Sequence, residues 1–333
     1  MKIQEVARRA GVSPATVSRT INNPSMVNAK TAKRVWKAVE ELNYYPNSQA
    51  RSLVSGRSRI LGLIVSDITN PFFPELVKGF EDIAIQNEYE ILISSTNYEP
   101  ERMALCVRRM LERKVEGVAI MTSEMDKHLV EQLAHRNVPL VFLDVGPTGE
   151  SISHVVVDYA MGVREAVEHL LSLGHRRIGF VSGPLGLKSA RIRRSAFLRL
   201  MSQYGIDEDK RLLEEGDHTV DGGLSAMTRM LESQCAPTAL LASNDLTAIG
   251  MMRAVHRAGL SVPRDISIVG FDDIHLAEFT EPPLTTVRLS RRELAEHAFH
   301  ALLGDSGEAP GSQSKLETHL IIRESTGQAP PGA

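Results

Sequence analysis

Three side chains near the N-terminus have the types and the spacing that suit contacts with the edges of DNA bases. Ala15 and Arg19 are four residues apart, so on a helix they would share one face, and Thr16 lies beside them. An arginine can bind guanine through two hydrogen bonds, and an alanine methyl can pack on the methyl group of thymine. Ser18 and Asn22 are better suited to phosphate oxygens, which orient a protein on the duplex without reading its sequence. Arg19 is therefore predicted to be the main direct base contact.

Two short helices must present these side chains. Residues 3–10 carry apolar side chains at helical spacing, which predicts one buried face. Gly11 suits the left-handed residue that often ends a helix, because glycine adopts that conformation without steric cost. Ser13 is a candidate N-cap and Pro14 suits the first helical position, so a second helix is expected to begin there. These signals predict a helix-turn-helix that enters the major groove; an ordinary pair of amphipathic helices is the alternative.

A third helix and a short segment after it complete the N-terminal region. Helical spacing of apolar residues predicts a helix over residues 29–42, with Trp36 in the core of the three-helix unit. Pro46 ends this region, because the residue before a proline avoids the helical conformation. Asn47 would cap a further helical segment that stops at Gly56. At roughly nine residues this segment is too short to be stable alone in water, which suits a hinge that orders on docking.

Charge divides the 333 residues into two parts. Residues 1–59 hold eleven Lys and Arg against three Glu, a net charge of +8, whereas the remaining chain carries a net charge of -11. A polyanionic partner for the first part alone explains this division, because its basic side chains would neutralise phosphates and release counterions. The length suits two or three globular domains.

From Ile60 onward, short apolar runs alternate with helical segments, which predicts parallel sheets covered by helices on both faces. The first series has strands expected at 60–65, 90–94, 117–121, 140–143 and 154–157, with helices starting near residues 71, 99 and 126. The second has strands expected at 177–181, 212–216, 239–242 and 266–270, with helices near residues 160, 189, 221, 245 and 275. A helix over 291–303, a loop over 304–314 and a strand over 319–322 follow. The predicted fold class is α/β, with two lobes in tandem behind an all-α headpiece.

Polar and aromatic side chains follow several of these strands, at the edge where an open parallel sheet binds ligands. The candidates are Asn70, Phe72, Phe73 and Asp144 in the first lobe and Arg193, Asn244 and Asp272 in the second. Carboxylates and amides can bond the paired hydroxyls of a sugar, and aromatic faces can pack on the apolar side of its ring. Simpler roles are the alternative: Asp272 and Asp245 could cap helices, Phe73 could belong to the core, and Arg193 could pair with a surface acid.

In order and combination, these stretches resemble the LacI/GalR family of bacterial transcription regulators. The matching motifs within residues 3–327 are VARRAGVSPATVSRTINN, YYPNSQARSL, ILGLIVSDITNPFF, LGHRRIGFVSG, SNDLTAIG, DISIVGFDD, PPLTTVR and IIRESTG. The resemblance implies a helix-turn-helix headpiece (1–45), a hinge helix and linker (46–58) and an effector-binding and dimerisation core (59–327). The tail (328–333), QAPPGA, is expected from its composition to be disordered. The core would be a two-lobed, type I periplasmic-binding-protein-like fold with parallel sheets. Its N-lobe would comprise 59–159 and 290–318, and its C-lobe 160–289 and 319–327, with crossings near Tyr159, Leu289 and Thr318.

The resemblance also implies roles for single residues. The DNA contacts would be Ala15, Thr16, Ser18, Arg19, Asn22, Asn28, Asn47, Ala50 and Leu53, and the effector contacts would be the seven candidates named above. In this family a pair of hinge leucines inserts into the minor groove at the operator centre, and Leu53 matches that position. Leu289 is a departure, because the family's carbohydrate binders often have glutamine there, which puts one polar ligand contact in question.

Other classes of protein fit the sequence less well. A dehydrogenase or kinase is disfavoured because no GxGxxG follows a strand and no GxxxxGK[ST] loop is present. His297 and His300 have a metal-compatible spacing but lack a third ligand, so neither a metal nor a cofactor is expected. A transport binding protein would need a secretion signal and would lack the basic headpiece. Cys106 and Cys235 show no redox spacing, and no apolar run of about 18 residues occurs, so a cytoplasmic protein without membrane contact is expected.

The sequence therefore predicts a ligand-responsive regulator, not an enzyme, that binds a pseudo-palindromic operator as a homodimer. A sugar or sugar derivative is the favoured effector, which would make the protein a repressor of a carbohydrate-utilisation operon. A regulator of the same fold that responds to a purine or another small metabolite is the alternative. A sugar-binding transport protein or an α/β enzyme is a less favoured alternative of a different class. Closure of the lobes on the ligand would change the separation of the two hinges and so the DNA contact.

Overall fold

The computed structural model of the protein describes residues 3–45, 57–122, 127–144, 146, 152–206, 212–233, 237–304 and 311–331. The chain forms two compact units, Met1–Ser58 and Arg59–Ala333. Among the residues described, no helix is long and apolar enough to cross a membrane.

The first unit is a three-helix headpiece. Its helices are α1 (Ile3–Ala10), α2 (Pro14–Asn22) and α3 (Ala29–Glu41), with the short 3-10 helix η1 (Pro24–Met26) between α2 and α3. Gly11 follows α1 with a φ of +65°, and the Ser13 hydroxyl caps α2 by accepting a hydrogen bond from the Thr16 amide at 3.2 Å. The predicted helix-turn-helix is confirmed, and its turn is made by the glycine and the N-cap that indicated it.

The headpiece core excludes its tryptophan. Val6, Val17 and Val35 are fully buried, and small alanine side chains complete the core between the three helices. The expectation that Trp36 belongs to this core is wrong, because 42% of its surface is exposed. Trp36 follows the inward-facing Val35 directly, and one helical residue turns the side chain by about 100°, which carries the indole to the flank of α3.

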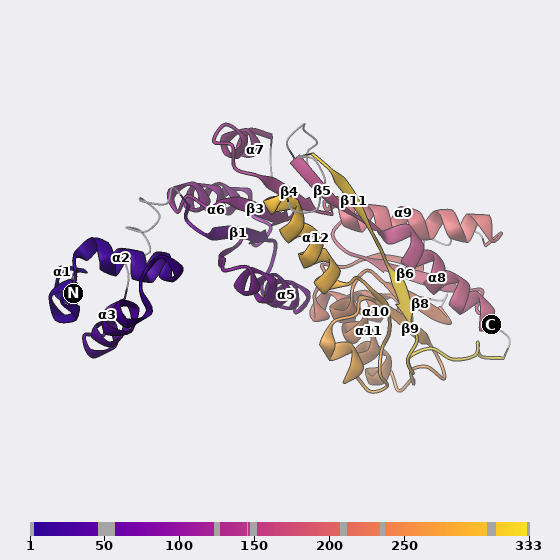
Figure 1. Ribbon diagram of the computed structural model, residues 1–333. Coiled ribbons are helices and arrows are strands. Elements are labelled where there is room, and N and C mark those ends of the chain that lie inside the picture. Colours follow the sequence, from indigo (N-terminus) through magenta and orange to yellow (C-terminus); the bar gives the residue numbers. More distant parts are fainter. Residues whose placement is uncertain are drawn as a thin grey trace. The chain divides into compact units, whose positions relative to one another are not determined.

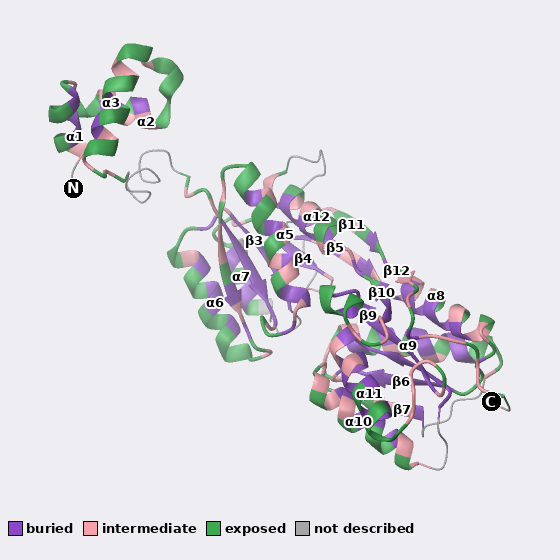
Figure 2. Ribbon diagram, turned by 90° about the horizontal axis from the view of Figure 1, so that it is seen from below, coloured by how far each residue is buried: buried purple, intermediate pink, exposed green. Residues whose placement is uncertain are grey.

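The second unit contains two lobes, and the N-lobe is built on a six-stranded parallel sheet. The strands are β1 (Ile60–Val65), β2 (Glu90–Ser95), β3 (Gly117–Met121), β4 (Leu140–Leu143), β5 (Ile152–Asp158) and β11 (Gln313–Glu317), in the order β11-β5-β4-β3-β1-β2. The helices are α5 (Phe72–Gln86), α6 (Pro100–Glu112), α7 (Lys127–Ala134) and α12 (Arg291–Leu303). Two apolar clusters fill the space on its faces, one containing α5 and α12 and the other α6 and α7. The inner strands β1, β3 and β4 are buried on both faces, which explains their continuous apolar runs (Figure 2).

The C-lobe repeats this design. Its strands are β6 (Ile178–Ser182), β7 (Leu213–Glu215), β8 (Ala239–Ala242), β9 (Ser267–Asp272), β10 (Thr285–Arg288) and β12 (His319–Ile321), in the order β12-β10-β9-β8-β6-β7. All neighbours are parallel except the edge strand β12, which is antiparallel to β10. Helices α8 (Tyr159–Ser172) and α9 (Lys188–Gln203) pack together, as do α10 (Val220–Glu232) and α11 (Asp245–Arg257) (Figure 1). The short 3-10 helix η3 (His275–Glu278) follows β9. The predicted α/β class with two parallel-sheet lobes is confirmed.

The chain passes between the lobes at three places: between β5 and α8, between β10 and α12, and between β11 and β12. The three segments meet around Thr318, which is fully buried. Its hydroxyl donates to the Asp158 carbonyl at 2.7 Å and accepts from the Gly162 amide at 3.0 Å. A Cβ at Gly162 would lie 2.2 Å from the Val287 side chain, so only glycine allows this close approach.

Three details differ from the sequence expectations. Strand β10 was not predicted. The start of β11 was placed in the loop 304–314. Because β11 is an edge strand with one buried side chain, Leu316, its sequence lacks an apolar pattern. The tail from Gln328 had been expected to be disordered. Residues 328–331 are instead described, and the Ala329 amide donates to the Leu173 carbonyl at 2.9 Å, which docks them on the C-lobe.

Candidate functional site

The exposed face of α2 carries the candidate DNA contacts. Ala15, Arg19 and Asn22 are exposed, whereas Val17 and Thr20 on the opposite face are buried. Ser18 and Thr16 are half-buried, and the Thr16 hydroxyl lies 2.9 Å from that of Ser13 within the helix cap. The side chains predicted to meet bases and phosphates therefore share one solvent-facing surface, as major-groove docking by a second helix requires.

The remaining candidate DNA contacts lie outside α2. Asn28 is exposed, and its side chain caps α3 by accepting a hydrogen bond from the Lys30 amide at 2.9 Å. Asn47, Ala50 and Leu53 lie outside the described residues.

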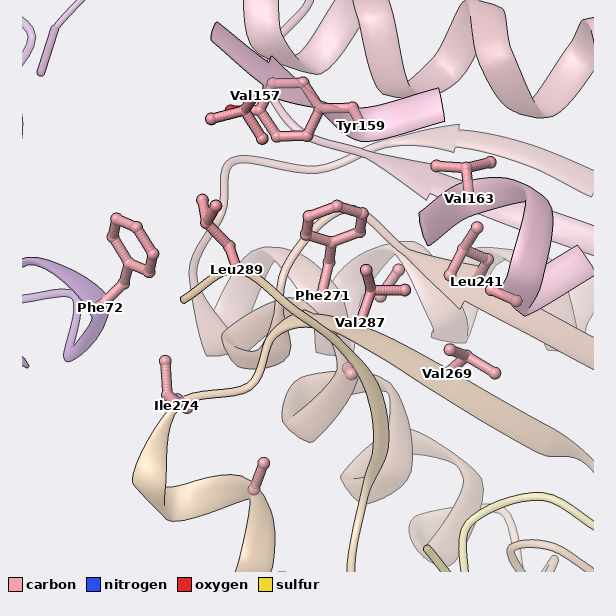
Figure 3. Close-up of a cluster of buried hydrophobic side chains, with 14 of the residues drawn as sticks. Phe72, Val157, Tyr159, Val163, Leu241, Val269, Phe271, Ile274, Val287 and Leu289 are labelled. Atoms are coloured by element: carbon pink, nitrogen blue, oxygen red, sulfur yellow. The ribbon is translucent and has the colours of Figure 1, made fainter. Parts of the chain in front are cut away.

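The candidate effector site is a cleft between the lobes, at the carboxyl ends of the strands. All seven candidates from the sequence line it, namely Asn70, Phe72, Phe73, Asp144, Arg193, Asn244 and Asp272. The cleft encloses about 650 Å³, with open solvent at its mouth included. This size suits a small metabolite. Its apolar floor continues into a buried cluster that includes Phe72, Tyr159, Phe271 and Leu289 (Figure 3).

On the N-lobe side the cleft is fixed by local hydrogen bonds. The Asn70 side chain accepts from the Phe72 amide at 3.1 Å, which places Phe72 and Phe73 at the start of α5 with their rings edge to face, 5.4 Å apart. Asp144 follows β4 and accepts a hydrogen bond from the Tyr159 hydroxyl at 2.7 Å. Tyr159 begins α8 after the first crossing, so this bond ties the N-lobe carboxyl to the C-lobe.

On the C-lobe side Arg193 is held rigidly. Its guanidinium donates to the Ser243 carbonyl at 2.6 Å and lies over the rings of Tyr159 and Phe271, 5.0 and 5.1 Å from their centroids. The alternative that Arg193 pairs with a surface acid is excluded by this burial, since only 6% of its surface is exposed. Aromatic stacking fixes the plane of the guanidinium without consuming all of its donors.

Asn244 serves the fold as well as the cleft. Its side chain caps α11 by accepting from the Thr247 amide at 3.0 Å, and its amide nitrogen donates to the His218 carbonyl at 3.0 Å. Asp272 caps no helix. The buried Asp245 instead binds the Ile274 amide and the Thr286 hydroxyl. The cap of α11 is therefore Asn244, and the alternative that Asp272 caps a helix is wrong.

Burial perturbs the acids and the histidine of the cleft. Burial raises the pKa of Asp272 from 3.8 to about 7, against the opposing charges of Arg193 and Arg291. Burial also raises the pKa of Asp144 to about 6, although the Tyr159 hydrogen bond and Arg193 lower it. Burial and the nearby Arg193 lower the pKa of His218 to about 3, so its imidazole is neutral. Perturbed groups gathered in one cleft are typical of a binding or catalytic site.

The backbone around the cleft is strained at the same residues. Asp144, His218 and Asp272 have φ values of +84°, +67° and +110°, in the region that favours glycine. Such conformations cost on the order of 1–3 kcal/mol each and gather at functional sites. The strain therefore marks the same three residues as the perturbed pKa values.

Several lining residues were missed by the sequence analysis. They include Tyr98, Thr122 and His218, whereas Leu289, named above as a departure from the family pattern, also lines the cleft. The three missed residues follow β2, β3 and β7, so the strand-end rule that found Asp144 could also have found them. The Thr122 hydroxyl is buried and has no hydrogen-bond partner within the described chain, which leaves it available to a ligand. Within the part of the chain that the structure describes, no three His, Cys, Asp or Glu side chains form a group that could hold a metal ion.

Comparisons with known proteins agree with this arrangement. Residues 2–47 match the bacterial regulatory proteins of the lacI family, and residues 167–326 match the periplasmic binding protein-like domain. The HTH-type transcriptional repressor PurR of Vibrio atlanticus (strain LGP32) is 34% identical over 97% of both chains. A solved structure of a lac repressor dimer bound to operator and the anti-inducer ONPF is 31% identical in sequence, with a TM-score of 0.86. A solved complex of the transcriptional regulator CelR with cellobiose is 30% identical, with a TM-score of 0.70. Each match covers 98% of this chain and 99% of the other chain. The chain therefore belongs to the LacI family of ligand-responsive bacterial transcriptional repressors.

Proposed function

We propose that this protein represses a carbohydrate-utilisation operon, binding a pseudo-palindromic operator as a homodimer and a sugar or sugar derivative in the interlobe cleft. The headpiece supplies one solvent-facing reading helix, and two-fold symmetry of a dimer would match it to two half-sites. As a DNA-binding repressor it would act in the cytoplasm. Its relatives are repressors, and we infer no enzymatic activity.

The observation that carries the choice of a sugar is the set of polar groups in the cleft. Asp144 and Asp272 come from opposite lobes, and Arg193 is near enough to act on the pKa of both. A polyhydroxylated ring presents hydroxyl groups that can both donate and accept hydrogen bonds. It could therefore bond carboxyls in either ionisation state and the guanidinium as well. The buried cluster with Phe72 and Leu289 would meet the apolar face of the ring.

A purine is the second candidate effector, supported by the similarity to repressors named PurR. A flat base would favour stacking between parallel rings. Phe72 and Phe73 lie edge to face at 88°, so these two rings do not form parallel walls for a flat base. The other ring side chains that line the cleft are those of Tyr98, Tyr159 and His218. The similarity in sequence supports a purine, whereas the arrangement of side chains in the cleft supports a sugar.

A thermal-shift screen of the full chain separates these two classes. D-ribose, D-galactose and cellobiose would be compared with hypoxanthine and guanine at equal concentrations. A ligand at a hundred times its Kd stabilises by about 2.7 kcal/mol. Stabilisation by a sugar supports the proposal. Stabilisation by hypoxanthine or guanine and by none of the sugars would replace it with the purine alternative.

Operator binding is tested independently of the effector. Selection of duplexes from a random pool should yield two inverted half-sites, and the affinity for them should fall steeply with salt. Six to ten phosphate contacts imply roughly 10³ to 10⁵ lower affinity between 50 and 200 mM salt. Recovery of a single half-site without inverted symmetry would contradict the dimeric reading.

A further inference from the structure

Beside Asp272, contacts between the two lobes converge on one ion pair, Glu75 with Arg291. Glu75 lies on α5 of the N-lobe, and Arg291 begins α12, which packs against α5. The Arg291 Nε lies 3.0 Å from the Glu75 Oε2. The side chains are 18% and 28% exposed respectively, so the pair is largely shielded from water.

Both members of this pair also bind the C-lobe. Arg291 donates from Nη1 to the Asp272 carbonyl at 2.5 Å and from Nη2 to the Asp273 carbonyl at 2.7 Å. Glu75 accepts from the His275 amide at 3.0 Å through Oε1. Three backbone groups at the end of β9 and just after it, the carbonyls of residues 272 and 273 and the amide of residue 275, are thus held by two side chains of the N-lobe. A planar guanidinium can make such a fork of bonds, and an ammonium group cannot reproduce it.

The two carbonyls that Arg291 holds belong to strained residues. Asp272 and Asp273 have φ values of +110° and +55°, conformations that persist only where the surroundings enforce them. The Asp273 carboxylate is turned to Arg288 and Arg323, at 2.6 and 2.7 Å. The Asp272 carboxyl lines the cleft. Arg291 therefore fixes the backbone from which one acid faces the cleft and the next faces away.

We propose that Glu75 and Arg291 form an interlobe latch in which Arg291 is the positioning residue for Asp272. The latch couples the direction of the Asp272 carboxyl to the separation of the lobes, because the Arg291 guanidinium bonds both the Glu75 carboxylate of the N-lobe and the Asp272 carbonyl of the C-lobe. That Asp272 contacts an effector rests on the function proposed above. The latch itself concerns the ligand-free chain and does not depend on which effector binds.

The latch also acts on the charge of Asp272. The groups that face this carboxyl are Arg193 from α9, Arg291 from α12 and Glu75 from α5. Tyr159 and Asp245 also interact with it electrostatically. Arg291 lowers the pKa of Asp272 and Glu75 raises it, both against the larger effect of burial. Loss of the Arg291 charge should therefore raise the pKa of Asp272 further.

The first test measures the lobe separation in the full-length, ligand-free protein. Spin labels on cysteines introduced at Gln132 of α7 and Arg199 of α9 report the distance between the lobes. The native cysteines are removed by Cys106→Ala and Cys235→Ser. Labelled chains are diluted with unlabelled ones so that only distances within one chain are measured. Arg291→Met should shift and broaden the distance distribution. Glu75→Gln should do so more mildly, since glutamine can still accept from the His275 amide. Arg292→Met is the matched control, because Arg292 pairs with Glu296 on the exposed face of the same helix. Distributions for both latch variants identical to wild type would overturn the latch.

The second test separates positioning from simple charge pairing. In the double variant Glu75→Arg/Arg291→Glu the ion pair can re-form, but a glutamate cannot donate to the two carbonyls. This variant should not recover the wild-type distance distribution, and full recovery would overturn the positioning role.

A third measurement follows the Asp272 carboxyl by carbon-13 NMR, with Asp272→Asn as the assignment control. The titration midpoint should rise by about one pH unit in Arg291→Met and stay near wild type in Arg291→Lys. An unchanged midpoint in Arg291→Met would also overturn the positioning role. A screen that finds no sugar would refute the proposed function and leave these three results intact.

Discussion

Replacing the Asp272 carboxyl by an amide should stabilise the effector-free protein at alkaline pH. Asp272 is 8% exposed, and burial raises its pKa from 3.8 to about 7. Between these two values the native state keeps a proton that the unfolded state has lost. The free energy of unfolding therefore falls as the pH rises through this window, and the native protein carries the full cost of the buried charge above it.

The structure also sets the size of the effect. At 1.36 kcal/mol per pH unit, the window from 3.8 to about 7 corresponds to about 4 kcal/mol. Asp272→Asn removes the ionising group and keeps the shape, so this value is the upper limit of its stabilisation at pH 8. At pH 5 the part of this free-energy difference that develops between pH 3.8 and pH 5 is already present. The advantage of the variant should therefore grow by roughly 2–3 kcal/mol between pH 5 and pH 8.

Urea unfolding of full-length wild type and Asp272→Asn at pH 5 and pH 8 measures this difference. Both proteins must be compared at one concentration, because association of the chains contributes to the apparent stability. Asp82→Asn, on the exposed face of α5, is the matched control for the change of an acid to an amide. If Asp272→Asn showed the same pH dependence as wild type, the assignment of a buried ionising carboxyl to the cleft would be refuted.

Three further predictions concern other parts of the chain. Arg19→Ala should weaken operator binding by about 1–3 kcal/mol in fluorescence anisotropy and affect random duplex far less; equal losses on both would remove Arg19 as a base contact. Leu53→Ala should weaken operator binding more than twofold, or more than about 0.4 kcal/mol, and a smaller loss would exclude a minor-groove wedge. His175 is fully buried, and burial lowers its pKa below 6.5, so wild type should lose stability as the pH falls below 6.5. His175→Asn should be less stable than wild type at pH 7.5, but its free energy of unfolding, measured in urea, should fall less between pH 7.5 and pH 5.5. Equal losses in the two proteins would show that His175 does not cause the acid destabilisation.

The elements that sequence reasoning found are those with their own local signals. Gly11, Ser13 and Pro14 mark the turn of the headpiece, and the run 60–65 is apolar because β1 is buried on both faces. Strand β11 lacks such a signal, because an edge strand exposes most of its side chains and is defined by its pairing with β5. Trp36 was misplaced for a related reason: helical spacing alone does not show which side chains of an apolar stripe face the partner helices.

The candidate site was more predictable than its chemistry. Side chains that follow parallel strands converge on one edge whatever else the fold does, which is why all seven candidates line one cleft. Their ionisation and backbone strain depend on neighbours distant in sequence. Arg193 reaches Asp144 and Asp272, and Arg291 reaches Asp272 from a helix that begins after the second crossing. No local pattern contains this information.

The features of the cleft that lower the stability of the ligand-free protein are also those through which a ligand can change the arrangement of the lobes. A ligand shifts an equilibrium between lobe arrangements only by its differential affinity for them. Asp272 carries a strained backbone, a costly buried charge and a bond to the N-lobe through Arg291. A hydroxyl that donates to the Asp272 carboxylate would favour its ionised form and lower its pKa, so a sugar should bind more tightly as the pH rises toward 7 and release a proton on binding. The gain would be largest in the lobe arrangement that Arg291 holds. Effector binding would therefore select that arrangement by relieving a cost already present in the empty cleft.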